Sequence, residues 1–196
     1  MANHFYAYIS RMRCVKRWAL MRNTEEENIQ EHSHMVSVLA HALGVIRRDI
    51  FHQPCDVNAL ATAALYHDAS EIHTGDLPTP IKYHNAEIMS AYHAVEDLAV
   101  QKLLGMLPPE LRETYADVLA EDKDGDIYPL VKAADKLSAY IKCIEERKAG
   151  NNEFLSAEAQ TRAALEASPL PEVQYFLEHF IPAFERDLDE LGAIGQ

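Results

Sequence analysis

Cysteine, glycine and proline are all scarce in this sequence of 196 residues. The three cysteines, Cys14, Cys55 and Cys143, are odd in number, lie far apart and form no C-x-x-C motif. This argues against a disulfide framework or a zinc knuckle and fits reduced thiols in the cytosol. Seven glycines and nine prolines leave little room for disordered or low-complexity segments.

Long apolar runs are also missing. None approaches the roughly 18 residues that a membrane-spanning helix needs. The N-terminal residues lack the apolar segment and the small-residue cleavage site of a signal peptide. We therefore expect a soluble, cytoplasmic protein that does not associate with membranes.

Positive charge is the third shortage. The chain has 18 Lys and Arg against 31 Asp and Glu, which gives a formal net charge of −13. Nucleic-acid polymers need Lys and Arg to neutralise their phosphates, so we expect no such polymer as a partner. A small anionic substrate is still admissible, because exposed charges more than about 10 Å away are largely screened at physiological salt.

Strand patterns are absent, and helical patterns extend over most of the chain. No window shows the alternation rich in Val, Ile and Thr that is typical of strands. The length fits a single domain. We therefore predict an all-α, single-domain helical bundle over residues 1–196, with amphipathic stretches at about 85–104, 109–120, 128–148, 152–166 and 171–191.

One predicted helix carries a histidine on its inner face. Thr24 and Glu27 have the form of an N-terminal capping box and predict that a helix begins there. His32 lies at helical spacing among apolar residues and should face inward. His34 is rotated by roughly 200° around the axis, so the two cannot easily serve one site. His41 is expected to be structural or exposed.

A second helix should follow, and a stiff loop after it. We expect this helix to begin near Asp56 or Asn58 and to end before Gly75, since glycine readily adopts the left-handed conformation that ends helices. The two prolines of the segment Gly75–Pro80 forbid a regular helix and stiffen the loop.

Four residues form a candidate metal-binding set. His67 and Asp68 place an imidazole beside a carboxylate near the end of an apolar helix, and His32 and Asp135 lie on two others. Two neutral imidazoles and two carboxylates balance the charge of a divalent cation, and mixed ligands suit Zn, Mn, Co, Ni or Fe(II) better than Mg or Ca. Glu71 follows three and four residues later and should face the metal if the helix persists that far. Its carboxylate could orient or deprotonate a water molecule, or protonate a leaving group.

The order of these residues resembles a known superfamily. His32, then His67-Asp68, then Asp135 on successive helices is similar to the signature of the HD superfamily of metal-dependent phosphohydrolases, and the likeness extends from about Phe5 to the C-terminal helix. Longer segments are similar to the bacterial 5′-deoxynucleotidases of the YfbR type: Arg17–Asn23, Asn28–Ser33, Tyr66–Glu71, Thr74–Pro80 and Ala149–Phe154.

This resemblance implies a reaction and a cofactor. The reaction is hydrolysis of 2′-deoxyribonucleoside 5′-monophosphates to deoxynucleoside and phosphate, with little preference among bases and selection against ribose. The cofactor is one divalent metal ion, with Co, Mn, Zn, Ni or Cu as candidates, held by His32, His67, Asp68 and Asp135. A homodimer is suggested by the resemblance alone.

The same resemblance implies residue roles. Glu71, Asp68 and Arg17 are expected to be catalytic, and the planar donor fork of Arg17 suits it to orient the phosphate. Trp18 should fill the space that a 2′-hydroxyl needs, which selects deoxyribose by exclusion. Asp76 can accept a hydrogen bond from the sugar 3′-hydroxyl. The full set of expected substrate contacts is Arg17, Trp18, Asp68, Asp76, Leu77, Pro78, Thr79 and Asp135.

Two other functions stay open at this point. Another HD phosphohydrolase, acting on cyclic nucleotides, guanosine polyphosphates or nucleoside triphosphates, would keep the metal ligands and change the substrate contacts. Arg17-Trp18 and the segment Gly75–Pro78 favour the monophosphate. A helical interaction protein with a vestigial metal site would bind no divalent metal and release no phosphate.

Overall fold

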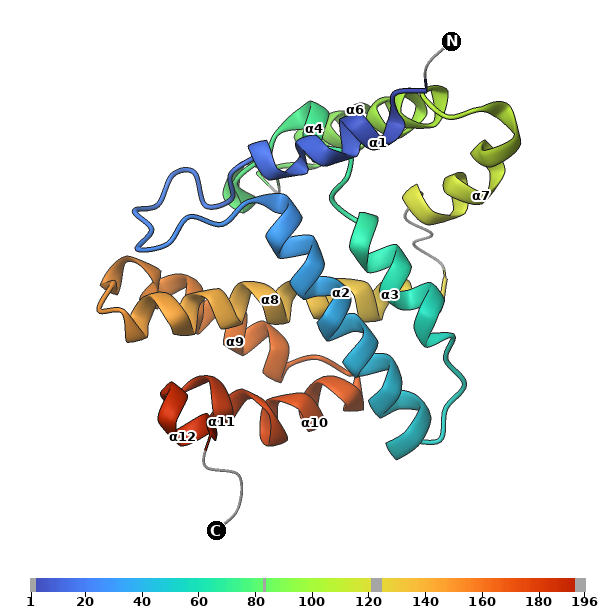
Figure 1. The fold of residues 1–196 in the computed structure, drawn as a ribbon. Coiled ribbons are helices and arrows are strands. Elements are labelled where there is room, and N and C mark those ends of the chain that lie inside the picture. The colour runs from blue at the N-terminus through green and yellow to red at the C-terminus, as the bar shows by residue number, and fades with distance from the viewer. Residues whose placement is uncertain (1–2, 83, 121–124, 193–196) are drawn as a thin grey trace.

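A computed structural model describes residues 3–82, 84–120 and 125–192 of the chain, which fold into helices with no strand in these ranges (Figure 1). The all-α prediction is confirmed. In chain order the elements are α1 (Phe5–Ile9), η1 (Ser10–Cys14), α2 (Ile29–Val45), η2 (Ile46–Ile50), α3 (Val57–Tyr66), α4 (Glu71–Thr74), α5 (Thr79–Lys82), α6 (Ala86–Gly105), α7 (Pro109–Leu119), α8 (Tyr128–Lys148), η3 (Asn152–Phe154), α9 (Leu155–Glu166), α10 (Pro171–His179), α11 (Ile181–Phe184) and α12 (Leu188–Gly192).

The larger of two buried clusters surrounds α2, which packs most extensively against α3 and α8. Leu39 and Leu43 of α2 share this cluster with Leu60 of α3 and with Leu137 of α8. Each such fully buried leucine contributes on the order of 2 kcal/mol to stability. His32 lies on the same face of α2 and is fully buried, whereas His34 and His41 are exposed, as the helical spacing predicts.

The smaller cluster joins α1, α6 and α7, which lie together at the upper end of the molecule in Figure 1. Phe5 and Leu103 are fully buried in it. Ala69 also belongs to this cluster, whereas Ala64, five residues earlier, belongs to the larger one. The turn that carries His67 and Asp68 therefore connects the two clusters.

The start of α2 differs from the prediction. Its capping box is formed by Asn28 and Glu31, whose side chains each accept a hydrogen bond from the backbone of the other. The prediction of a capping box at Thr24 and Glu27 was wrong, because both residues have partners elsewhere. The Thr24 hydroxyl donates to Glu146, and the Glu27 carboxylate accepts two donors from the preceding loop.

The end of α3 also differs. Asp56 caps the start of this helix as predicted, by accepting the backbone N–H of Ala59 at 2.9 Å. The helix ends at Tyr66, nine residues earlier than the predicted stop at Gly75. Beyond it the backbone N–H of Glu71 reaches only to the carbonyl of Asp68, at 3.0 Å, which is the spacing of a tighter turn. The chain re-enters a helix as α4, and Gly75, with a φ of 72°, ends it.

Prolines explain two further differences. The predicted stiff loop contains the short helix α5. This helix accommodates Pro80 in its first turn, where the missing backbone N–H of proline costs no intrahelical hydrogen bond. The stretch predicted at 171–191 is broken into α10, α11 and α12, and the first break lies just before Pro182, which can neither donate to the preceding turn nor fit against it. The stretches at 85–104, 109–120 and 128–148 match α6, α7 and α8 to within a residue, and that at 152–166 matches η3 and α9 together.

No helix in the described ranges is long and apolar enough to cross a membrane. The three cysteines are free, with Cys14 exposed, Cys55 partly buried and Cys143 buried.

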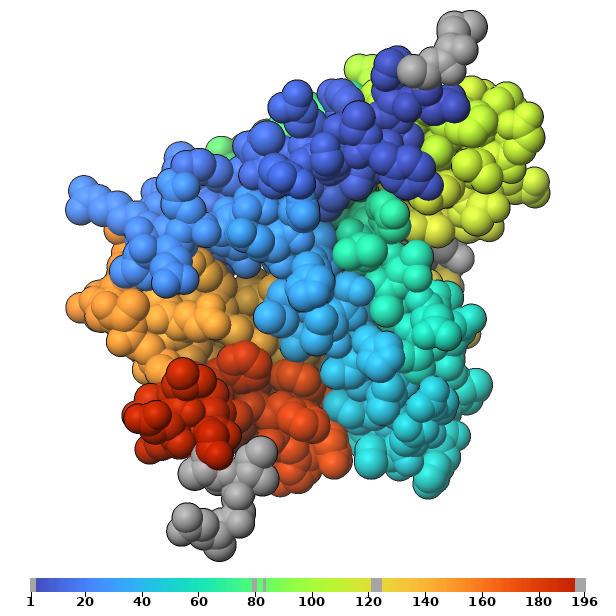
Figure 2. All heavy atoms as spheres, viewed as in Figure 1, coloured from blue at the N-terminus to red at the C-terminus, as the bar shows by residue number. Residues whose placement is uncertain are grey.

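The segment between η1 and α2, residues 15–28, is here called the Trp18 loop. Its two ends pair as an isolated antiparallel bridge between Lys16 and Asn28, and the N–H of Arg17 donates to the carbonyl of Glu27 at 2.9 Å. Figure 2 shows this loop, in blue, standing out from the body beside the orange segment that ends α8.

Glu146 anchors the Trp18 loop to α8. Its buried carboxylate accepts hydrogen bonds from the hydroxyl and the N–H of Thr24 at 2.7 and 2.9 Å, from Lys142 at 2.5 Å and from Asn151 at 2.8 Å. Lys142 also donates to the carbonyl of Glu25 at 2.6 Å. Although burial opposes ionisation, Lys142, Thr24 and Asn151 lower the pKa of Glu146 to about 2.

We expect Glu146→Gln to lower the free energy of unfolding at pH 7 by about 2 kcal/mol, because charge-assisted hydrogen bonds are lost while their donors stay in place. The folded pKa lies below the ordinary 4.5, so this stabilisation is complete above pH 4.5 and is lost as the pH falls toward 2. Urea unfolding at pH 7 and pH 3 measures it. Glu145→Gln, at the exposed neighbour, should change the free energy by less than about 0.5 kcal/mol. A Glu146→Gln deficit that is equally large at both pH values would contradict this prediction.

Candidate metal centre

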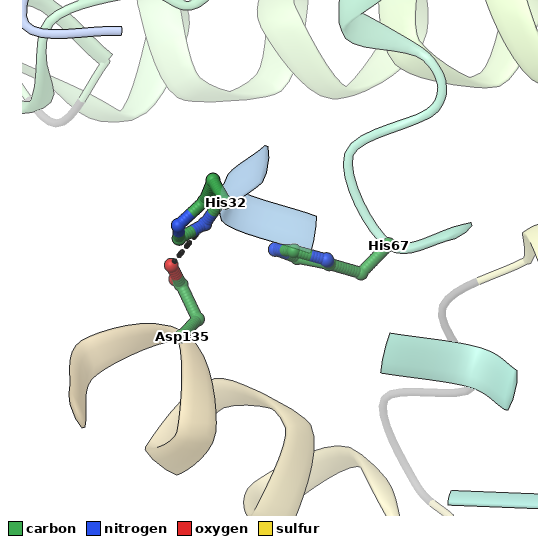
Figure 3. A group of neighbouring side chains, drawn as sticks. All are labelled: His32, His67 and Asp135. Carbon is green, nitrogen blue, oxygen red and sulfur yellow. Dashed lines mark ion pairs between the residues drawn. The ribbon is translucent and has the colours of Figure 1, made fainter. Parts of the chain in front are cut away.

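Three elements bring the predicted ligands together at the edge of the larger core. His32 comes from α2, His67 and Asp68 from the turn after α3, and Asp135 from α8. Figure 3 shows His32, His67 and Asp135 pointing toward a common point. Their ligand atoms all lie within 4.8 Å of one another, and His32 Nε2 is 3.1 Å from Asp135 Oδ1. Because α2, α3 and α8 pack directly on each other, this geometry follows from the core.

Asp68 completes the set. Its Oδ2 lies 3.5 Å from His32 Nε2 and 3.2 Å from His67 Nε2. One carboxylate oxygen thus faces both imidazoles, and Asp68 adjoins the group of His32, His67 and Asp135.

The other nitrogen of each imidazole fixes its orientation. His67 Nδ1 lies 2.7 Å from the carbonyl of Ala64, and because a carbonyl can only accept, Nδ1 carries a proton and Nε2 is the nitrogen left to bind a metal ion. His32 Nδ1 lies 3.1 Å from the hydroxyl of Ser138. Both Nε2 atoms are buried without a well-formed hydrogen bond in the described part of the chain. Such pairs of oriented imidazoles with free Nε2 atoms are typical of metal sites, so these residues fit a divalent cation.

Both carboxylates of the set are ionised. Burial alone would raise the pKa of Asp68, but His67, His32 and Arg17 hold it well below its usual range. Burial likewise opposes the ionisation of Asp135, and His32 and His67 hold the pKa of Asp135 far below normal. The site therefore concentrates two negative charges beside two imidazoles, which is the charge that a divalent cation balances.

Glu71 stands beside this cluster as an almost completely buried carboxyl at the start of α4. It is 6% exposed, and its Oε2 has no hydrogen-bond partner within the described residues. Burial, followed by the negative charges of Asp68 and Asp76, raises the pKa of Glu71 to about 10. Burial and these charges therefore favour the protonated carboxyl of Glu71 in the metal-free protein.

Arg17 supplies the positive charge of the site. Its Nη1 lies 3.6 Å from Asp68 Oδ2, and its side chain is only 11% exposed. Burial alone would lower the pKa of Arg17, but Asp68, Asp135 and Glu27 raise it above its usual value. The guanidinium is thus held in the charged form beside the cluster.

Trp18 follows with a backbone φ of 56°, a left-handed conformation that is rare for a bulky residue. Its indole Nε1 donates to Glu27 Oε2 at 3.0 Å, and its ring is tilted against Phe154 with the centroids 5.3 Å apart. Burial raises the pKa of Asp76, and the nearby Arg17 guanidinium and backbone N–H of Trp18 oppose this rise. Arg17, Trp18 and Asp76 therefore form one assembly.

The remaining predicted substrate contacts lie between α4 and α5. Leu77 and Pro78 are partly buried there. The side chain of Thr79 lies outside what the structure describes.

Two residues of the site were missed by sequence reasoning. Ser138 lies three residues after Asp135, and that helical spacing could have predicted its contact with the His32 side of the cluster. Glu27 was assigned to a helix cap, and nothing in its local pattern indicates that it meets the Arg17 and Trp18 side chains. A cavity of about 280 Å³ opens beside this loop, lined by Lys16, Arg17, Ala19, Met21, Asn23 and Glu26.

Comparison with solved structures places this helical bundle, with its His, His-Asp and Asp set, in the class of HD-domain phosphohydrolases. An HD-domain phosphohydrolase from Listeria innocua matches with a TM-score of 0.83 and 25% identity, over 96% of this chain and 92% of that one. The cyanophage S-2L HD phosphohydrolase DatZ, solved with dA and one catalytic Zn²⁺, matches with a TM-score of 0.58 and 25% identity, over 94% of this chain and 96% of that one.

The sequence matches a narrower family. Residues 4–184 match the model of the 5′-deoxynucleotidase YfbR-like family. The proteins named 5′-deoxynucleotidase YfbR from Shigella flexneri and Escherichia coli are 48% identical to this chain over 191 residues, which cover 97% of this chain and 96% of theirs. The chain therefore belongs to the YfbR-like 5′-deoxynucleotidase family, which confirms the resemblance noted in the sequence.

Proposed function

We propose that this chain is a metal-dependent 5′-deoxynucleotidase that hydrolyses 2′-deoxyribonucleoside 5′-monophosphates to deoxynucleoside and phosphate. The observation that carries the proposal is the cluster in which two oriented imidazoles and two ionised carboxylates converge beside a buried arginine. The names of the relatives that are 48% identical support the substrate class. DatZ, with its bound dA and Zn²⁺, supports a deoxynucleoside and a metal at this kind of site.

His32, His67, Asp68 and Asp135 would hold one divalent ion. When bound, such an ion polarises the phosphoryl group and makes a water molecule acidic enough to act as a nucleophile near neutral pH. The Zn²⁺ of DatZ makes zinc one candidate, beside Co, Mn, Ni and Cu.

The protein's own groups would handle the phosphate and the proton. The Arg17 guanidinium faces the cluster and would bind phosphate oxygens with its planar fork, which orients phosphorus for in-line attack by water. As water adds, the bond from phosphorus to the 5′-oxygen breaks. The raised pKa of Glu71 favours it as the group that delivers a proton to the leaving 5′-oxygen.

Sugar selection would depend on the assembly of Trp18 and Asp76. We propose that the indole occupies the space of a 2′-hydroxyl and that the Asp76 carboxylate accepts a hydrogen bond from the 3′-hydroxyl. Leu77, Pro78 and Thr79 complete the proposed substrate contacts with Asp68 and Asp135. These proposed contacts involve only the phosphate and the sugar of the nucleotide, which is consistent with low preference among bases.

Three further proposals concern the oligomeric state, the location and the partners of the protein. A homodimer is proposed from the resemblance alone. A cytoplasmic location is proposed from the free cysteines. The lack of a nucleic-acid or membrane partner follows from the net charge of −13 and stays a prediction.

We expect purified protein to release phosphate from dAMP with a kcat/KM at least about tenfold higher than from AMP. A colorimetric phosphate assay across paired ribo- and deoxyribonucleoside monophosphates measures this. EDTA should abolish phosphate release, and Co²⁺, Mn²⁺ or Zn²⁺ should restore it. Equal rates on both sugars would contradict the proposed selectivity, and no phosphate release with any of these metals would favour the vestigial site of an interaction protein.

A further inference from the structure

A single carboxylate oxygen of Glu27, outside the metal cluster, accepts hydrogen bonds from the side chains of both Arg17 and Trp18. Glu27 Oε2 accepts a hydrogen bond from Arg17 Nε at 3.0 Å and another from the indole Nε1 of Trp18, also at 3.0 Å. The Glu27 side chain is 16% exposed, so these bonds are largely shielded from water. Shielding strengthens charge-assisted hydrogen bonds, and one oxygen therefore fixes the position of two groups at once.

Glu27 also holds Arg17 against a competing attraction. The guanidinium lies between the carboxylates of Glu27 and Asp68, with its Nε 3.0 Å from one and its Nη1 3.6 Å from the other. Without the charge of Glu27, the guanidinium would be drawn toward Asp68 and would compete with a metal ion for that carboxylate. Glu27 thus keeps the arginine fork free to meet a phosphate.

The indole is held in an unfavourable backbone conformation. A left-handed φ of 56° is strained for a bulky residue and persists only when the surroundings hold it. The ring of Phe154 supports one part of the Trp18 indole, and Glu27 binds its Nε1. Phe154 provides apolar contact and the Arg17 guanidinium lies over the ring, 5.9 Å from its centroid, so the hydrogen bond to Glu27 is the contact that fixes the indole N–H.

We propose that Glu27 is the positioning residue that couples phosphate binding to the rejection of ribose, by fixing the Arg17 guanidinium and the Trp18 indole through one oxygen. This inference rests on the proposed function, in which Arg17 meets the phosphate and Trp18 the sugar. Glu27 itself touches neither the substrate nor the metal in this scheme.

Two variants separate the two bonds. Glu27→Ala removes both, and we expect the ratio of kcat/KM for dAMP over AMP to fall about tenfold, with the KM for dAMP raised about tenfold. Glu27→Gln keeps the shape and an amide oxygen that can accept from Trp18 Nε1, but it lacks the charge that holds Arg17. We therefore expect Glu27→Gln to raise the KM for dAMP about tenfold while it keeps the sugar ratio within about threefold of wild type.

Fluorescence gives a readout that does not depend on turnover. Trp18 is the only tryptophan of the chain, so intrinsic emission reports on this indole alone. Loss of the hydrogen bond in Glu27→Ala should free the ring and shift its emission to longer wavelength, whereas Glu27→Gln should stay near wild type. The matched control is Glu26→Gln, because Glu26 is the adjacent residue, is 69% exposed and pairs with Lys16.

Trp18→Ala serves as the reference for complete loss of sugar selection. It should lower the ratio of kcat/KM for dAMP over AMP at least as far as Glu27→Ala does. If wild type is selective but both Glu27 variants match Glu26→Gln in KM, sugar ratio and emission, the inference is overturned and the proposed function stands. If wild type releases no phosphate from dAMP, the proposed function fails first and the inference falls with it. A Glu27→Gln variant with the KM of wild type would overturn the role of the charge.

Discussion

Asp68→Asn is expected to lower kcat/KM for dAMP hydrolysis by on the order of a thousandfold, which corresponds to about 4 kcal/mol of transition-state stabilisation. Asp68 Oδ2 faces both imidazoles and lies 3.6 Å from Arg17 Nη1. An amide in its place cannot supply a negative charge to a cation, and it leaves the guanidinium without the partner nearest the cluster.

Two measurements check this result. Steady-state phosphate release gives kcat/KM, and elemental analysis of protein dialysed against a defined metal concentration gives the occupancy of the site. Asp49→Asn, which changes an exposed carboxylate paired with Arg48, serves as the control and should leave both unchanged. Activity within about tenfold of wild type at full metal occupancy would be incompatible with Asp68 as a ligand.

Glu71→Gln is expected to reduce kcat by about 10²- to 10⁴-fold with little change in the KM for dAMP. The glutamine fills the same buried position at the start of α4 but has no proton to deliver to the 5′-oxygen. Steady-state kinetics with dAMP measure the split between kcat and KM. Glu87→Gln, at an exposed position in the first turn of α6, should match wild type.

Stability distinguishes this proton-transfer role from a structural one. Because burial, Asp68 and Asp76 raise the pKa of Glu71 from 4.5 to about 10, the stabilisation associated with its neutral form is complete below pH 4.5 and is lost as the pH rises toward 10. Glutamine is neutral at every pH. EDTA-treated Glu71→Gln should therefore be at least as stable as EDTA-treated wild type at pH 8 in thermal unfolding. A variant that loses both activity and stability would indicate a structural residue.

The parts of the fold that hydrophobic periodicity determines were predictable. The helix α8 matches its predicted bounds, 128–148, because its apolar spacing is regular and because Pro129 in the first turn defines its start. Boundaries that depend on tertiary partners were not. Thr24 and Glu27 satisfy the pattern of a capping box, yet Glu146 and the Trp18 loop recruit them, and Asn28 takes the cap instead.

The residues of the site likewise divide into those that periodicity could place and those that depend on tertiary partners. His32 and Asp135 could be placed from their positions on apolar helices, because helices that share a core bring their inner faces together. The turn at Tyr66 could not be predicted, since Ala64 offers its carbonyl to the His67 side chain and the backbone tightens around it. Glu27 was out of reach because its partners depend on how the loop closes across space. The metal identity, the residue roles and the homodimer stay predictions.

The turn that carries His67 and Asp68 has a consequence for how the molecule unfolds. Ala64 and Ala69, on either side of it, belong to separate buried clusters, and α2 and α8 contribute His32 and Asp135 from the larger one. An ion held by all four side chains would tie this connecting turn to the larger core. Its binding free energy would then add to that of folding, and the two clusters would open as one cooperative unit when the ion is bound and more independently when it is removed.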